Sequence, residues 1–166
     1  MKKESGTAKD WRSHPVVREG TAIVLVVAAL FFTISLLTYN NTDPAFTTPG
    51  QGKVHNYGGL VGSYTADILY HLVGAAAFLF PLYVFAFAGI LFRNKKWTRK
   101  QLLIHLAGGV MLVLSLATLL SLEYETLKLF SQTIYKAGGV IGNGVASGMN
   151  LLFAKTGTYL MVLTLL

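Results

Sequence analysis

The side chains that could do chemistry in this sequence are few and widely spaced. The chain has no cysteine, which excludes disulfides, thiol nucleophiles and thiolate metal sites. No two histidines share a spacing typical of zinc ligands, and the four are His14, His55, His71 and His105. We find no catalytic constellation. We therefore predict that this chain is not an enzyme and that it holds no cofactor and no metal.

One acid–base pair has helical spacing. Asp67 and His71 lie four residues apart, which places them on one face of a helix. Such a pair could relay protons or ions, or it could be a polar pair on an amphipathic helix, which is the interpretation we favour. No carboxylate lies within an apolar stretch, and this argues against a proton-coupled transporter.

Two glycine motifs recur along the chain. Gly58, Gly59 and Gly62 are repeated 80 residues later, and the small-xxx-small spacing suits close helix–helix contact. A phosphate-cradling role is disfavoured because the chain has no Gly-x-x-x-x-Gly-Lys-Ser/Thr motif. The residues that we predict to act in packing are Gly58, Gly59, Gly62, Gly138, Gly139, Gly142 and Gly157.

The glycine motifs belong to a longer internal repeat. Thr21 and Gln101 keep the 80-residue offset, and so do Ala66 and Ala146. With a three-residue slip, Gly74 matches Gly157, the last of the predicted packing glycines. Each unit would contain a span, a loop, a glycine motif, a short helix and a second span. Since each unit crosses the membrane twice, the two copies would have the same orientation.

The elements that must position these residues are expected to be membrane helices. Of the 166 residues 53% are apolar and 13% are charged, about half the charged fraction of an ordinary soluble domain. Uncharged or nearly uncharged stretches cover residues 21–39, 72–92, 102–122 and 140–166. The first would be about 28 Å long as a helix, enough to cross the ~30 Å hydrocarbon core. We predict an all-α, polytopic bundle of four spans, built as two tandem repeats.

The fourth stretch needs a break. As one helix it would place Lys155 near its centre, at a cost of roughly 3 kcal/mol. We therefore expect an interfacial helix over 140–154, a spanning helix from Gly157, and a Lys155 side chain that extends to the headgroups. Ten residues remain from Gly157 to Leu166, so this last span is expected to be truncated to about 15 Å.

The charges predict an orientation. Ten of the 14 lysines and arginines lie in the tail 1–20 and in the loop 93–100. By the positive-inside rule, both ends of the chain and this loop are cytoplasmic. The membrane domain would then cover 21–166, with repeat one at 21–92 and repeat two at 101–166. The net charge of +7 lies on the cytoplasmic side.

The basic loop has two interpretations. Its cations could contact anionic lipid or DNA, or they could act only as topology determinants, which we favour because the orientation rule by itself accounts for them. These topology residues are Arg93, Lys95, Lys96, Arg99 and Lys100.

The order of these motifs resembles the N-terminal membrane domain of the FtsK/SpoIIIE family of bacterial DNA translocases. The most specific part is Asn-x-Gly-Gly-x-x-Gly at Asn56–Gly62, followed by Ala66 and Asp67. The other matching stretches are residues 18–20, 37–40 with 43–44, 138–142 and 157–160. The resemblance covers the chain from about Arg18, but the linker, ATPase motor and DNA-reading domain of the family would lie beyond Leu166.

The resemblance implies a membrane anchor. In the family this domain holds a hexameric motor at the division septum of the inner membrane, where the motor moves chromosomal DNA. ATP, magnesium and DNA would be bound only by the missing motor. The implied partners of this chain are the lipid bilayer, further copies of itself and division-site proteins, with residues 40–65 and 123–139 as the expected contact surfaces.

Two other classes stay open. A small transporter or channel subunit would use the duplicated fold as a pore, although no charged side chains are predicted at mid-membrane. A membrane scaffold without a motor would be the same domain in isolation. The downstream reading frame discriminates between the scaffold and the translocase.

Overall fold

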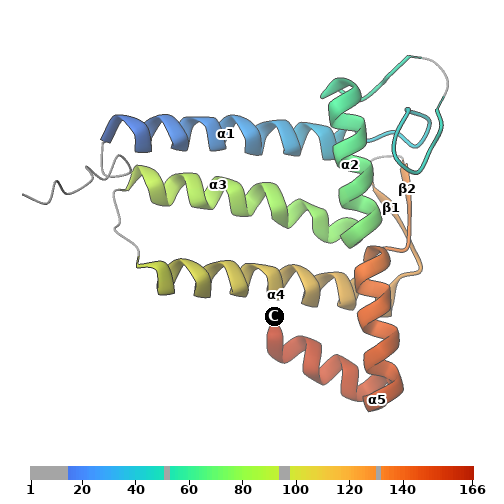
Figure 1. Cartoon of the computed structure of the whole chain (residues 1–166). Coiled ribbons are helices and arrows are strands. Elements are labelled where there is room, and N and C mark those ends of the chain that lie inside the picture. The colour runs from blue at the N-terminus through green and yellow to red at the C-terminus, as the bar shows by residue number, and fades with distance from the viewer. Residues whose placement is uncertain (1–14, 51–52, 94–97, 130–131) are drawn as a thin grey trace, which may run out of the picture.

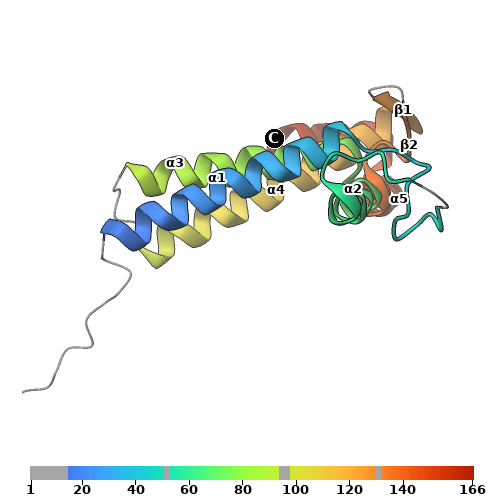
Figure 2. The ribbon, with the colours of Figure 1, turned by 90° about the horizontal axis from the view of Figure 1, so that it is seen from above.

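The chain folds almost entirely into helices. The computed structural model describes residues 15–50, 53–93, 98–129 and 132–166. In chain order it contains α1 (Pro15–Leu37), α2 (Gly59–Val73), the short 3-10 helix η2 (Gly74–Phe78), α3 (Leu79–Phe92), α4 (Arg99–Glu123), strands β1 (Thr126–Leu129) and β2 (Gln132–Tyr135), and α5 (Gly139–Leu165). The helices α1, α3 and α4 lie side by side, as Figures 1 and 2 show.

Among the described residues, three helical stretches are long and apolar enough to cross a membrane. They are Pro15–Leu37, Gly59–Phe92 and Arg99–Glu123, and only 22% of the residues in the apolar window of each are buried within the protein. The remaining side chains, which are mostly apolar, face outward. An exposed apolar surface of this extent is not expected on a protein surrounded by water. The first three predicted spans are confirmed in position, and lipid is the solvent that their exposed faces require.

The helix α2 lies across one end of these spans, which we call the loop end. Its connection to η2 and α3 is made at Gly74, whose φ of 61° and ψ of −140° lie outside the helical region. Pro81 is the third residue of α3, directly after the 3-10 turn. There its missing N–H and fixed φ are tolerated.

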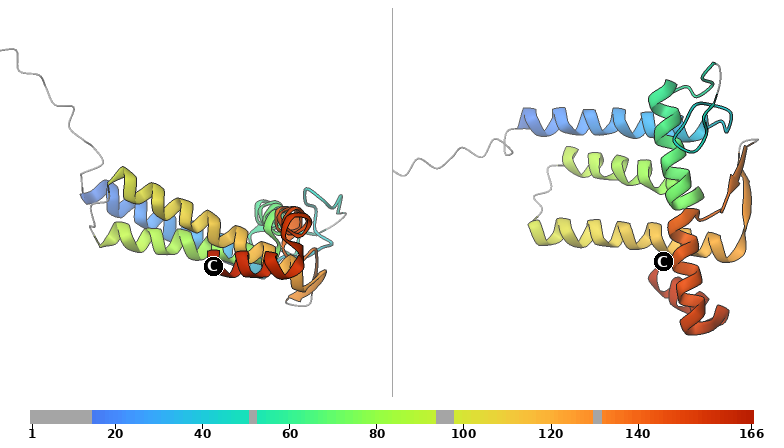
Figure 3. Two further views of the ribbon diagram at one scale, coloured as in Figure 1. Left: turned by 90° about the horizontal axis from the view of Figure 1, so that it is seen from below. Right: turned by 45° about the vertical axis from the view of Figure 1, so that its right-hand side comes forward.

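The helix α5 bends in the same manner. Its backbone leaves the helical region at Ala154, with φ 53° and ψ 174°. The first part lies across the loop end in line with α2, and the second part turns back beside the spans (Figure 3). The predicted break before Gly157 is confirmed, and the bend itself lies at Ala154. Ala154 follows Gly74 by 80 residues, so the bend keeps the offset without a slip.

The strands correct the all-α expectation. β1 and β2 form an antiparallel hairpin in which Thr126 pairs with Tyr135 and Leu129 with Gln132. Four-residue strands carry a weak pattern signal, which a prediction based on long apolar stretches does not detect. The β-branched Ile134 is buried and joins a core cluster with Leu36, Ala66, Tyr70 and Ala77. The hairpin therefore packs against α2.

The second part of α5 is anchored at the loop end of α4. The Tyr159 hydroxyl donates to Glu123 Oε1 at 2.6 Å, and Lys155 Nζ lies 5.9 Å from the centroid of the Tyr159 ring. Glu123 is the last residue of α4. Lys155 therefore lies level with a helix end and not at mid-span, as a charged side chain in a membrane protein requires.

Candidate interaction site at the loop end

The loop end is organised by two buried carboxylates, and Asp43 is the first. Its side chain is fully buried and accepts from the His55 backbone N–H at 2.9 and 3.1 Å, one distance to each oxygen. The His55 ring contributes Nδ1 at 2.8 Å, and the Asn56 backbone N–H donates at 2.8 Å. Asp43 thereby links the beginning of the loop between α1 and α2 to the end of the same loop.

Two opposing effects set the acidity of Asp43. Burial alone raises the pKa of a carboxyl group, but the backbone and ring hydrogen bonds from His55, the backbone bond from Asn56 and the attraction of the His55 charge outweigh it. The net result is that the pKa of Asp43 lies below its ordinary value. The folded loop therefore favours the ionised carboxylate.

This shift predicts how the loop responds to acid. A depressed carboxyl pKa contributes stability that is present above the unfolded value, about 3.9, and is lost as the pH falls through the folded value. We expect hydrogen-exchange protection factors at His55 and Asn56 not to fall between pH 7 and 5, and to fall below pH ~4. Loss of protection already between pH 7 and 5 would contradict the assignment. Amides in the middle of α1 serve as the internal control.

The first glycine motif lies against the end of α1. Asn56 Nδ2 donates to the Ser35 carbonyl at 2.8 Å, and its Oδ1 accepts from the Gly58 N–H at 2.8 Å. A Cβ added to Gly58 would lie 2.5 Å from Ser35 Oγ, and one added to Gly62 would lie 2.4 Å from Asn56 Oδ1. Gly59 has open space around it. Two of these three glycines thus leave room for polar side chains.

The second glycine motif lies against the backbone of α4 and α2. A Cβ on Gly138 would lie 1.8 Å from the Ala117 carbonyl oxygen, and one on Gly142 would lie 2.4 Å from it. Gly139 has a φ of +69° and approaches the Leu72 carbonyl. Gly157 does not join this group, since the atoms near it belong to Phe153 of its own helix. A glycine outside the predicted set, Gly74, meets this motif, with its Cβ position 2.7 Å from the Gly139 nitrogen.

Asp67 is the second buried carboxylate, and its partners differ from those expected. It accepts from the Tyr39 hydroxyl at 3.1 Å and from Thr47 through the backbone N–H at 2.8 Å and Oγ1 at 2.7 Å. Within the described part of the chain it makes no hydrogen bond to His71, whose side chain is exposed. Asp67 therefore fastens the loop to α2. Burial, with the nearby Asp67 charge, raises the pKa of Tyr39 well above its ordinary value.

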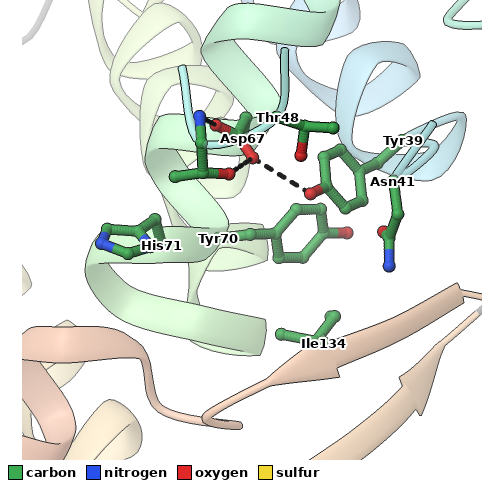
Figure 4. Close-up of a pocket in the computed structure, with 8 residues that line it drawn as sticks. Tyr39, Asn41, Thr48, Asp67, Tyr70, His71 and Ile134 are labelled. Atoms are coloured by element: carbon green, nitrogen blue, oxygen red, sulfur yellow. Dashed lines mark hydrogen bonds between the residues drawn. The ribbon is translucent and has the colours of Figure 1, made fainter. Parts of the chain in front are cut away.

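A cavity of about 410 Å³ lies beside Asp67. Figure 4 shows the Tyr39 and Tyr70 rings on one wall, with Asp67 and His71 on the helix behind them. The ring centroids of the two tyrosines are 4.9 Å apart. The residues lining the cavity are Tyr39, Asn41, Thr47, Thr48, Asp67, Tyr70, His71 and Ile134. Asp67 and His71 carried a spacing signal in the sequence, and Tyr70 lies on the same helix, α2. The other lining residues come from a loop and a hairpin without periodicity.

The opposite end of the spans carries the basic loop. Arg93 caps α3, and Arg99 and Lys100 lie in the first turn of α4, after a capping box formed by Thr98 and Gln101. Lys95 and Lys96 lie outside the described residues. Cations at a helix N-terminus oppose the helix dipole, so the stability of α4 does not account for them. In the described ranges no group of three His, Asp or Glu side chains could hold a metal.

Comparison with known proteins decides the family. The family model described as the 4TM region of DNA translocase FtsK/SpoIIIE matches residues 15–166. The chain belongs to this family. It is 30% identical over 177 residues to the DNA translocase FtsK of Pseudomonas putida, covering 99% of this chain and 21% of that protein. It is 31% identical over 171 residues to DNA translocase FtsK 1 of Neisseria meningitidis serogroup B, covering 96% and 21%.

The match to the FtsK relatives concerns their membrane region. The chain spans about a fifth of the length of these curated relatives, and the matching family model describes a transmembrane region and not a motor. No solved structure matches. This FtsK membrane region, with its apolar helices, is a bacterial inner membrane protein domain.

Proposed function

We propose that this chain is the membrane anchor of a bacterial DNA translocase that couples chromosome segregation to cell division. The observation that carries the proposal is the family match over residues 15–166. ATP, magnesium and DNA belong, in this proposal, to a motor in the remainder of such a protein. The anchor would hold that motor at the septum, in a homo-oligomer that the family resemblance suggests to be a hexamer, and would contact other division-site proteins.

The anchor is proposed to contain four spans in two tandem repeats. Left-handed backbone conformations recur 80 residues apart, at Gly59 and Gly139 and again at Gly74 and Ala154. Buried small residues keep the same offset in the spans, with Ser35 matching Ser115 and Ala29 matching Gly109. The part of α5 after Ala154 corresponds to α3 and would begin the fourth span. These equivalences support a duplication without a change of orientation.

The glycine motifs are proposed to assemble the bundle. For five of the predicted residues, an added Cβ would lie less than 3.0 Å from an atom of another segment of the chain: Gly58, Gly62, Gly138, Gly139 and Gly142. In lipid, helix association depends on such close packing because there is no hydrophobic force between helices. Gly59 and Gly157 complete the proposed set with less support.

The proposed topology has a direct test. The basic loop lies at the end of the spans opposite the buried Asp43 and Asp67, so its cations would be cytoplasmic and the loop end would lie outside. Alkaline phosphatase fused at Thr47 is expected to be active, and the same enzyme fused at Asn94 inactive. β-galactosidase fusions at the two sites should give the reverse pattern. Equal activities at the two sites would contradict the proposal.

The anchoring role is tested by a domain exchange in cells. This chain would replace the membrane region of the full-length FtsK of Pseudomonas putida in a strain depleted of its own copy. We expect septal localisation and normal division. Localisation over the whole membrane with unsegregated chromosomes would overturn the proposal, and a defect confined to solute uptake would favour the transporter alternative. The relative carrying its own membrane region is the positive control, and an unrelated four-span anchor is the negative control.

A further inference from the structure

The two buried carboxylates at the loop end differ in how many of their acceptor positions are used. An ionised carboxylate offers about four lone-pair positions. Asp43 receives four contacts, three of them from His55 and one from Asn56. Asp67 receives three, from Tyr39 and from two groups of Thr47, and Oδ2 takes only one of them. Counting donors within the described part of the chain, all acceptor positions of Asp43 are used, whereas one acceptor position on Asp67 Oδ2 remains unused.

The unused position belongs to a carboxylate that lines the cavity. Asp67 is only 2% exposed, yet it forms part of the wall of the 410 Å³ space described above. Tyr39 and Tyr70 line the same space, and their ring centroids lie 4.9 Å apart (Figure 4). A buried negative charge beside aromatic faces is the environment that attracts an organic cation, through charge and through the ring quadrupoles.

The cavity is found where the two halves of the chain differ. Ser147 stands at the position equivalent to Asp67, and the hairpin β1–β2 stands where the first half has the loop that carries Asp43. The cavity combines both halves, because Ile134 comes from the hairpin and the remaining lining residues come from the first half. The cavity therefore occurs once, although the helices around it are repeated. A purely architectural role would not require such a cavity.

We propose that this cavity binds the guanidinium or ammonium group of a basic side chain presented by a partner polypeptide. The inference rests on the proposed function only in placing that partner among the extracytoplasmic segments of division-site proteins. The loop and the hairpin that wall the cavity lie on the side of α2 away from the spans (Figure 1). A lipid headgroup beside the spans would have to reach past α2, so a polypeptide is the better occupant.

The test is a titration of the full chain in lipid nanodiscs at pH 8, where histidine side chains are ordinarily neutral. The probe is N-acetyl-arginine amide, and the matched control is N-acetyl-citrulline amide, which has the same shape without the charge. Chemical shifts of ¹³C-labelled Tyr39 and Tyr70 report binding. We expect saturable shifts with a roughly millimolar Kd for the arginine compound, and at least tenfold weaker binding of the citrulline compound.

Two substitutions at Thr48 keep the test independent of folding. Thr48 lines the cavity and contributes only its carbonyl to the loop hydrogen bonds described, which accepts from Ala45. Thr48→Lys would place a cation of the chain itself beside Asp67 and is expected to abolish binding. Thr48→Gln adds similar length without charge, so its binding is expected to be at least tenfold tighter than that of Thr48→Lys. Asp67→Asn should weaken binding at least tenfold.

Three outcomes would overturn the proposal. Equal shifts with the citrulline compound would show that charge is not recognised, and the absence of saturable shifts up to 50-fold above the expected Kd would show that there is no site. If nanodiscs of phosphatidylethanolamine, but not of phosphatidylglycerol, give the bound shifts without a probe, the occupant is a lipid headgroup. None of these outcomes depends on a motor or on division, so they are distinct from failure of the anchoring role.

Discussion

Replacement of Gly74 by alanine is expected to destabilise the protein by about 3 kcal/mol, since a left-handed conformation costs about 1–2 kcal/mol and overpacking a further 1–3. The φ of Gly74 is +61°, and an added Cβ would lie 1.9 Å from the carbonyl oxygen of Ala137. That carbonyl accepts the hydrogen bond from the Ala75 N–H at 2.8 Å. The substitution would therefore force apart the contact that joins the two halves. The measurement is unfolding in mixed micelles on titration with SDS.

Gly89 provides the control for this prediction. It lies within α3 and has nothing within 4 Å of an added Cβ, so Gly89→Ala should stabilise the helix by up to about 1 kcal/mol. Opposite signs for the two substitutions are the expected result. Equal stability of Gly74→Ala and the unchanged protein would show that the bend at residue 74 does not require glycine.

The second large effect is expected at Asp43. Asp43→Ala would leave the buried Asn56 N–H and the backbone N–H of His55 without their acceptor, and each unpaired buried donor costs about 1–3 kcal/mol. We expect the free energy of opening of residues 40–58 to fall by about 3 kcal/mol. Hydrogen exchange at Asn56 and Gly58 measures it.

The neighbouring residue gives a matched control for Asp43. Thr42 is exposed. Its side chain bonds to Asn40 alone among the described residues, so Thr42→Ala should change the opening free energy by less than about 1 kcal/mol. A loop that stays equally protected in Asp43→Ala would mean that the carboxylate does not hold it. Tyr70 and Ile134, which pack beneath the loop, would then carry its stability.

The spans were predictable from the sequence because their signal is local. A long uncharged stretch such as 102–122 identifies a membrane helix without reference to any partner, and the structure places α4 over it. The bend at Ala154 followed from the same reasoning, since Lys155 could not remain at mid-span. The glycine motifs were also visible, because recurrence at a fixed offset is a property of the sequence alone.

The candidate site could not be predicted in the same way. Asp67 receives the hydroxyl of Tyr39, 28 residues earlier, and Asp43 is bonded to residues 12 and 13 positions later in an irregular loop. Nothing in the spacing of these residues indicates that they meet. The helical spacing of Asp67 and His71 was a misleading signal, since burial turned the carboxylate toward the loop. Gly74 was seen only as a repeat marker, because its contact, Ala137, lies 63 residues away.

The helices that lie across the loop end have a mechanical consequence. In the proposed role, a motor pulling on DNA would load the spans along their length, toward the cytoplasm. The part of the molecule at the far end is broader than the bundle, because α2 and the first part of α5 extend sideways there (Figure 3). To extract the spans, the load would have to drag Asp43 and Asp67 into hydrocarbon, where each unpaired polar group costs several kcal/mol. The crossing helices would thus resist extraction by distributing the load over a wider area of the outer leaflet.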